Sequence, residues 1–195
     1  MIKKNWKEYF QSLRIFIFFA GFVFIFAAVF GFFLAKTSPG DSQELFLGLR
    51  KILEPILAAS PFYQFLFIFL KNFFTIFIVI FFGIVFGVFP FLALYVNGHL
   101  LGTIFFLFQK EASFLVFLKS IIPHGIIEIP VLILAAAIGL DLGREAIQKI
   151  VLKKESKIKK KFSLALEIFF KVLIPLLILA AFVEVFLVPK ILGIN

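Results

Sequence analysis

Long apolar runs constrain this chain more strongly than any other feature of its sequence. Each is about twenty residues or longer and is built almost wholly from Phe, Leu, Ile, Val, Ala and Gly. A helix of that length crosses the hydrocarbon core of a bilayer, and within lipid a helix pairs its own backbone groups. The runs therefore predict an all-α fold, a polytopic integral membrane helical bundle with about five transmembrane helices. The expected spans are residues 13–35, 72–91, a third that ends near 109, 121–143 and 163–188.

Composition agrees with a membrane protein and narrows the chemistry. Hydrophobic residues fill 63% of the chain, against about 45–50% in a soluble globular protein. The absence of cysteine excludes disulfides, thiolate catalysis and cysteine-ligated metals. A formal net charge of +9 could indicate a nucleic-acid partner, but the basic residues cluster beside the apolar runs, where they typically orient a membrane protein. We therefore expect the lipid bilayer as a partner, and no nucleic acid and no cofactor.

The charged segments predict a topology. A basic segment precedes the first span, and eight basic residues oppose two glutamates in the cytoplasmic basic loop expected at 144–161. With the N-terminus in the cytoplasm, four crossings return the chain there at this loop, as the positive-inside rule requires. The sequence thus predicts a multi-pass protein of the plasma membrane with its C-terminus outside. Anionic lipid headgroups are the expected partners of Arg144–Lys161.

One membrane domain is expected to cover residues 1–195. Residues 41–60 mix apolar and charged side chains at helical spacing, which predicts an extracytoplasmic amphipathic helix on the surface or over the bundle. The boundary between the second and third spans could lie at the Pro90 break or at the Asn97–Gly98 turn. The sequence does not choose between them. Residues 114–122 form an apolar piece too short to cross the membrane alone.

Glycines four residues apart mark the second and third spans. Gly83 and Gly87 form one such pair, and Gly98 and Gly102 form another. This spacing lets helix backbones approach closely in membranes. It predicts helix-packing faces and a homodimer or larger homo-oligomer.

The fourth span carries polar residues where an apolar run enters the membrane. It begins with Pro123, His124 and Gly125, and Glu128 follows four residues after the histidine. His124 and Glu128 therefore share one helical face, about 6 Å apart along the axis. A carboxylate at that depth is costly unless it is paired, protonated or faces a cavity. This stretch is the candidate polar intramembrane site.

Two interpretations of this site stay open. His124 and Glu128 could form hydrogen bonds that tie helices together, or they could handle protons, ions or a partner protein. Pro130 deprives a carbonyl one turn earlier of its helical partner, so a neighbouring group must satisfy it. Asn72, on the second span, could approach the same site. A metal is not expected, because His124 and Glu128 would need His99, which we expect near the opposite side of the membrane.

The order of these residues resembles the stage II sporulation protein M family. The resemblance covers about residues 65–145 and rests on Asn72, Asn97-Gly98-xxx-Gly102 and Pro123-His124-Gly125-xx-Glu128, with the flanking spans agreeing in hydropathy only. It implies that these residues are the shared motif positions. It also implies a membrane organiser: in spore formers the namesake acts in engulfment with membrane-anchored partners that degrade peptidoglycan, and is not itself the hydrolase.

The expected function is accordingly a non-enzymatic membrane scaffold that organises partner membrane proteins. The alternative is a small transporter or an ion or proton channel that uses His124 and Glu128. The sequence has no glycine-rich phosphate loop, nucleophile elbow or HExxH motif, so nothing in it requires an enzyme. An intramembrane enzyme is a third alternative.

Overall fold

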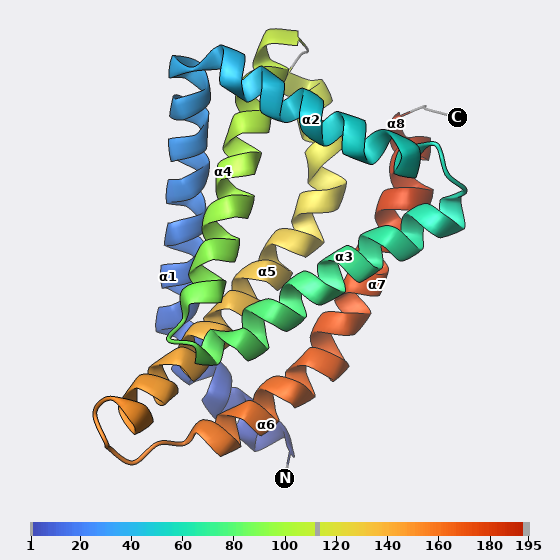
Figure 1. Cartoon of the computed structure of the whole chain (residues 1–195). Helices are drawn as coiled ribbons and strands as arrows, with labels where there is room; N and C mark the ends of the chain where they lie inside the picture. Colours follow the sequence, from blue (N-terminus) through green and yellow to red (C-terminus); the bar gives the residue numbers. More distant parts are fainter. Residues whose placement is uncertain (1, 112–113, 193–195) are drawn as a thin grey trace.

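The computed structural model describes residues 2–111 and 114–192, and every regular element in these ranges is a helix (Figure 1). This confirms the predicted all-α fold. The elements are α1 Ile2–Thr37, α2 Pro39–Leu57, α3 Pro61–Phe81, the 3-10 turn η1 Phe82–Ile84, α4 Val88–Glu111, α5 Phe114–Ile150, α6 Ile158–Ile168, the π-helical η2 Phe169–Leu173, α7 Ile174–Phe182, the π-helical η3 Val183–Leu187 and α8 Val188–Leu192.

Five stretches of the described chain are long and apolar enough to cross a bilayer, which confirms the predicted number. They are Trp6–Thr37, Pro61–Ile84, Val88–Gln109, Gly125–Ile150 and Ile158–Lys190. Their outward faces are apolar: on α1 the side chains of Phe18, Phe22 and Phe26 are 76%, 65% and 59% exposed. Large aromatic side chains in that number on one face suit contact with lipid rather than water. The chain is a multi-pass membrane protein.

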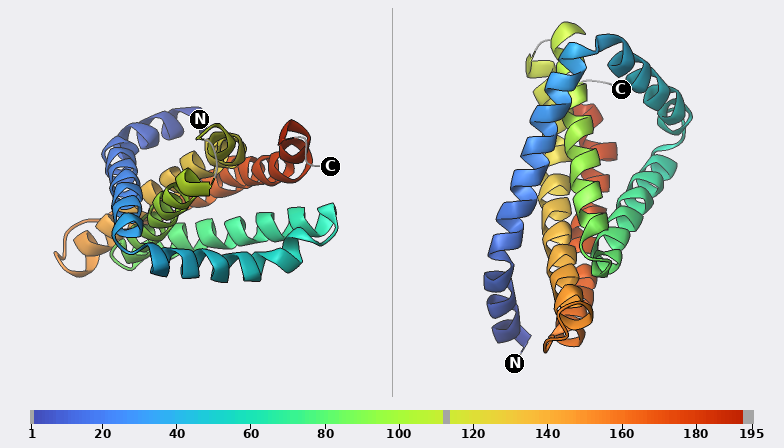
Figure 2. Two further views of the ribbon diagram at one scale, coloured as in Figure 1. Left: turned by 90° about the horizontal axis from the view of Figure 1, so that it is seen from above. Right: turned by 60° about the vertical axis from the view of Figure 1, so that its left-hand side comes forward.

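The helices form two groups joined by α5. α1 and α4 lie side by side, α3 packs against α7, and α5 contacts all four of these helices (Figure 1, Figure 2). The start of α1, the end of α5 and the loop 151–157 lie together at one end of the bundle, which we call the basic end. α2 crosses the opposite end, called the far end, where the described chain also finishes in α8 (Figure 1).

Close glycine contacts hold the helices together inside one chain. A Cβ atom on Gly98 would overlap the Phe24 carbonyl oxygen of α1, and one on Gly102 would overlap that of Ala28. At the other pair, a Cβ on Gly83 would lie 2.5 Å from Gly139 of α5. These approaches are possible only without a side chain. The glycine faces expected to support a homodimer are therefore occupied within the chain, and a homo-oligomer, which stays a prediction, would need other surfaces.

The boundary between the second and third spans lies at neither predicted position. The turn after η1 contains Phe86 and Gly87, with positive φ angles of 52° and 77°. Pro90 is the third residue of α4, in the first turn, where a helix has no partner for the missing N–H. Asn97 and Gly98 lie inside α4 because the glycine serves packing against α1 rather than a turn.

Three other expected boundaries were also wrong. The second span begins at Pro61 rather than at residue 72, since the aromatic residues 61–70 continue the same helix. α5 is continuous from Phe114 to Ile150, so residues 114–122 are not a separate piece. The expected loop 144–161 is mostly helical, and only residues 151–157 separate α5 from α6. These shifts matter because they place Asn72 and the basic residues at other depths than the sequence suggested.

Candidate functional site: a polar pocket within the bundle and an ion-pair cluster at its basic end

Asn72 lies deep in the bundle rather than at the start of a span. α3 begins at Pro61, so a helical rise of 1.5 Å per residue puts Asn72 about 16 Å further along the axis. That is near the middle of a hydrocarbon core of about 30 Å. A polar amide at this depth must find a partner within the protein.

The partner of Asn72 is Glu128. The Nδ2 group of Asn72, on α3, donates a hydrogen bond to Oε1 of Glu128, on α5, and both side chains are half-buried. The bond joins two helices that are 56 residues apart in sequence. It gives the carboxylate a neutral donor where an unpaired charge would be costly. The structure thus brings together the two predicted site residues that sequence spacing could only suggest were close.

A small pocket of about 50 Å³ adjoins this bond. Its polar wall comes from three helices, with Asn72 and Thr75 on α3, Asn97 on α4 and Glu128 on α5. Its apolar wall is formed by Ile76, Ile129, Leu132 and Leu177. A water molecule occupies about 30 Å³ in the liquid. The pocket is therefore matched to a water molecule or a small ion, not to an organic substrate.

The hydrogen bonds around the pocket determine what it can offer a ligand. Thr75 donates its hydroxyl hydrogen to the Lys71 carbonyl (2.8 Å), and Asn97 donates from Nδ2 to the Ala93 carbonyl (2.8 Å). Each of these bonds points back into the residue's own helix. Among the described residues nothing donates a hydrogen bond to the Thr75 hydroxyl or to the Asn97 amide oxygen, so both oxygens can accept one from a ligand. Together with a carboxylate, such oxygens suit a proton or a hard cation.

The other predicted site residues are distributed differently. The side chains of Pro123 and His124 lie outside the described residues, so the predicted His124–Glu128 pair stays a prediction. Pro130 lies within the unbroken α5 with an exposed side chain, and Gly125 lies in the same helix. Gly98 and Gly102 face α1 rather than the pocket.

His99 does not join Glu128. Its ring stacks on Tyr95 at 5.8 Å between centroids and lies 6.1 Å from the Phe30 ring of α1. It is absent from the residues that line the pocket. The described part of the chain holds no group of three or more His, Cys, Asp or Glu side chains that could bind a metal.

Residues 18–189 match the sequence profile of the family described as Stage II sporulation protein M. The chain belongs to the stage II sporulation protein M family. The matched range extends beyond residues 65–145 to the flanking spans, and it contains both Asn72 and Glu128. No curated protein and no solved structure shows significant similarity to the chain.

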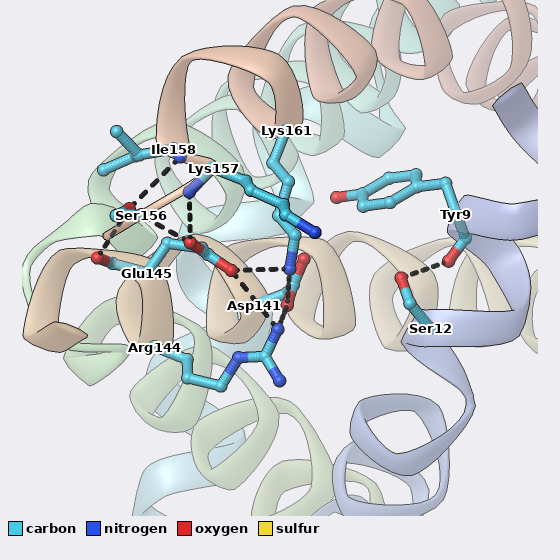
Figure 3. Close-up of polar contacts among 9 residues, drawn as sticks. All are labelled: Tyr9, Ser12, Asp141, Arg144, Glu145, Ser156, Lys157, Ile158 and Lys161. Atoms are coloured by element: carbon cyan, nitrogen blue, oxygen red, sulfur yellow. Dashed lines mark hydrogen bonds and ion pairs between the residues drawn. The ribbon is translucent and has the colours of Figure 1, made fainter. Parts of the chain in front are cut away.

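This stage II sporulation protein M family member has a second polar site, at the basic end, which was not predicted from the sequence (Figure 3). Asp141 is fully buried, and Glu145 and Lys161 are 4% and 8% exposed. Lys161, on α6, places its Nζ atom 2.7 Å from Asp141 Oδ1 and 2.8 Å from Glu145 Oε1. Arg144 contacts the same two oxygens at 2.9 and 3.3 Å. Two carboxylates of α5 are thus neutralised by two cations.

The second oxygen of Glu145 fixes the start of α6. Glu145 Oε2 accepts hydrogen bonds from the Ser156 hydroxyl (3.0 Å) and from the Lys157 backbone N–H (2.7 Å). Ser156 in turn accepts one from the Ile158 N–H at 3.2 Å. These bonds satisfy backbone donors at the start of a helix, where the helix itself has no acceptors for them.

The sequence contained a signal for this cluster. Asp141 and Glu145 are spaced i, i+4 and so share one face of α5, beside a segment rich in lysine. The spacing could have predicted that both carboxylates meet the same cation. Nothing in the sequence distinguished Lys161 from the other basic residues of that segment.

Proposed function

We propose that this protein is a non-enzymatic membrane scaffold that organises partner membrane proteins. The observation that carries the proposal is the hydrogen bond from Asn72 to Glu128, which uses polar groups deep in the bundle to tie α3 to α5 of the same chain. The adjoining space of about 50 Å³ is too small for an organic substrate. A fixed bundle that presents a constant lipid-facing surface is what an organiser requires.

The proposed scaffold would meet its partners mainly within the bilayer. Five spans account for most of the described chain, so the segments outside the membrane leave little room for a large soluble docking surface. α2 adds an amphipathic helix across the far end, with exposed Leu45, Leu47 and Ile52. This arrangement agrees with the family resemblance, which implies membrane-anchored partners.

The proposed orientation places the basic end in the cytoplasm of a cell with the protein in its plasma membrane. The N-terminal helix start and the loop 151–157 lie at the same end (Figure 1). Lysine and arginine near short loops favour the cytoplasmic side. The far end, with α2 and the C-terminal helix, would then face outward. Labelling of single cysteines introduced at the exposed positions Gln43 and Lys153 with an impermeant reagent on intact cells tests this: Gln43→Cys should react and Lys153→Cys should not.

The experiment that tests the scaffold compares Glu128→Gln with wild type in proteoliposomes at matched folded yield. The scaffold predicts no proton, Na⁺ or K⁺ flux that depends on Glu128, together with lower thermal stability or loss of assembly in the variant. Glu54→Gln, an equivalent change at an exposed site on α2, is the matched control and should alter neither property. Flux that Glu128→Gln abolishes would refute the scaffold.

A small transporter or ion channel is the second candidate. The observation that favours it is the pocket itself, which sets a carboxylate beside hydroxyl and amide oxygens at three helices. In that case Glu128→Gln would abolish flux while the folded protein keeps its thermal stability. Glu128→Gln therefore distinguishes the two functions: it should lower stability or assembly in a scaffold, and abolish ion flux in a transporter or channel.

A further inference from the structure

Two pockets adjoin at the basic end, and they differ in chemistry. One has a volume of about 380 Å³, and most of the residues that line it are polar or charged: Glu8, Tyr9, Ser12, Arg144, Glu145, Gln148, Glu155, Lys157, Lys160, Lys161 and Leu164. The other has a volume of about 410 Å³ and is mostly apolar, with Ile15, Phe16, Phe19, Phe86, Leu140, Ile147 and Leu152 in its wall. Arg144 and Gln148 belong to both pockets. The two spaces are therefore neighbours across a shared wall.

The two pockets are offset along α1 and overlap along α5. On α1 the polar pocket uses Ser12 and residues before it, whereas the apolar pocket uses residues 15–19. A shift of seven residues along a helix is about 10 Å, and it leads from the basic end toward the membrane centre. The Arg144 guanidinium lies at the junction, 5.1 Å from the centre of the Phe16 ring. A charged group over an aromatic ring suits the boundary between headgroups and acyl chains.

The polar pocket contains an unused donor. The Tyr9 side chain is only 4% exposed, and its hydroxyl has no hydrogen-bond partner among the described residues. Figure 3 shows the ring on α1 pointing this hydroxyl toward the cluster around Lys161 and Asp141. A buried hydroxyl without a partner is costly. An acceptor in the pocket would satisfy it.

The pocket is lined by four cations, Arg144, Lys157, Lys160 and Lys161, against three carboxylates, Glu8, Glu145 and Glu155, and this small positive excess favours an anion. Glu145 does not oppose one, since Lys161 and Arg144 occupy one of its oxygens and Ser156 and Lys157 occupy the other. Glu8 and Glu155 are exposed, as are the side chains of Lys157 and Lys160. Eight basic residues against two glutamates in 144–161 make the surrounding potential positive, which attracts anionic headgroups.

We propose that these two pockets together bind one anionic phospholipid, with its phosphate in the polar pocket and an acyl chain along the apolar one. Tyr9, Lys157 and Lys160 would contact the phosphate. A phosphate ion alone would use the polar pocket but not the apolar one. The apolar neighbour is therefore what assigns the site to a lipid.

The test measures lipid binding to the full-length protein by native mass spectrometry from detergent. The probes are phosphatidylglycerol and phosphatidylcholine with identical acyl chains, and inorganic phosphate alone. The test variant is Lys157→Gln/Lys160→Gln, which keeps the Lys157 backbone N–H that binds Glu145. The matched control is Lys154→Gln/Lys159→Gln, with the same charge change at exposed lysines outside the pocket. Tyr9→Phe removes only the unpaired hydroxyl.

Wild type should retain phosphatidylglycerol in preference to phosphatidylcholine. Each proposed lysine–phosphate contact is a charge-assisted hydrogen bond, which the control lysines do not make, so the test variant should lose roughly tenfold or more in affinity. The control should lose much less, and Tyr9→Phe should lose a few-fold. Equal losses of affinity in the two double variants would show that the whole basic surface attracts the lipid, and would refute the proposal that the lipid binds in this pocket. Equal retention of both lipids would refute the proposal that the site selects an anionic phospholipid. Binding of inorganic phosphate as tight as that of phosphatidylglycerol would refute the proposed role of the acyl chain.

Discussion

Lys161 provides the sharpest test of how the basic end is held together. Its ammonium group contacts two buried carboxylates, Asp141 at 2.7 Å and Glu145 at 2.8 Å. Lys161→Met keeps an unbranched apolar side chain out to the ε position and removes the terminal ammonium group. The variant leaves two carboxylates with Arg144 as their one remaining cation among the described residues, and Arg144 is 45% exposed.

The burial of the partners sets the expected magnitude. Removing one member of a buried ion pair typically costs about 3–5 kcal/mol, because the other member is left buried without compensation. Asp141 is fully buried and Glu145 is 4% exposed, but Arg144 still contacts both carboxylates, so the lower part of this range applies. Lys159→Met, on the same helix with an exposed side chain, should change the free energy of unfolding by less than about 0.5 kcal/mol.

The assay is equilibrium unfolding in mixed micelles, followed by tryptophan fluorescence from Trp6. Lys161→Met should lower the free energy of unfolding by several kcal/mol relative to Lys159→Met. Adding Asp141→Asn to Lys161→Met should recover part of the loss, since it removes one of the two carboxylates that then share Arg144 alone. If Lys161→Met proves as mild as Lys159→Met, or if Asp141→Asn makes it worse, the buried ion pair is not what stabilises the basic end.

Three further predictions use the same unfolding assay. Gly102→Ala should cost about 1–3 kcal/mol because its methyl group overlaps a carbonyl of α1, whereas Gly48→Ala, with nothing within 4 Å, should be neutral or stabilising. Asn72→Ala should cost about 1–3 kcal/mol because the half-buried Glu128 carboxylate loses the hydrogen bond from Asn72. Thr75→Ala, whose hydroxyl donates to a carbonyl of its own helix, should cost clearly less. Ser156→Ala should cost about 1 kcal/mol through the lost hydrogen bond to the buried glutamate of the basic end. For Gly102 and Asn72, an effect equal to that of the paired control would contradict the contact invoked. For Ser156, an unchanged free energy of unfolding would contradict it.

The spans were predictable because lipid leaves a chain few choices. An apolar run of about twenty residues must be helical to pair its backbone, and five such stretches are present in the described chain. The amphipathic pattern of residues 41–60 likewise corresponds to α2, Pro39–Leu57. These predictions depend on local sequence alone, which is why they succeed.

The boundary between the second and third spans was not predictable in the same way. Asn97-Gly98 has the composition of a turn, but its glycine faces a carbonyl of α1, and that contact depends on a helix more than sixty residues away. The true turn contains Phe86 at a positive φ of 52°, a conformation that sequence preferences disfavour for a bulky residue. Tertiary packing thus decided both positions.

The polar sites were predictable only in part. Glu128 was identified by its depth in an apolar run, but its partner Asn72 was placed at the wrong depth because Pro61 was not seen as the start of the span. At the basic end, the spacing of Asp141 and Glu145 was visible, and their cation was one of eight nearby. Sequence shows which groups need a partner in lipid, while the fold decides which partner they find.

The Asn72–Glu128 hydrogen bond and the Lys161–Asp141 ion pair both join another helix to α5. The distance between these two polar ties allows a last test of the proposed function. Glu128 and Asp141 are thirteen residues apart on one continuous helix, which corresponds to about 20 Å. Substitutions that far apart, with no shared partner, normally have additive effects on stability. In a fixed scaffold, Asn72→Ala and Lys161→Met should therefore add to within about 0.5 kcal/mol. A transporter needs α5 to shift between two arrangements, and both ties would then resist the same movement. A coupling clearly larger than that margin would favour the transporter, because only a moving α5 connects two contacts that do not touch.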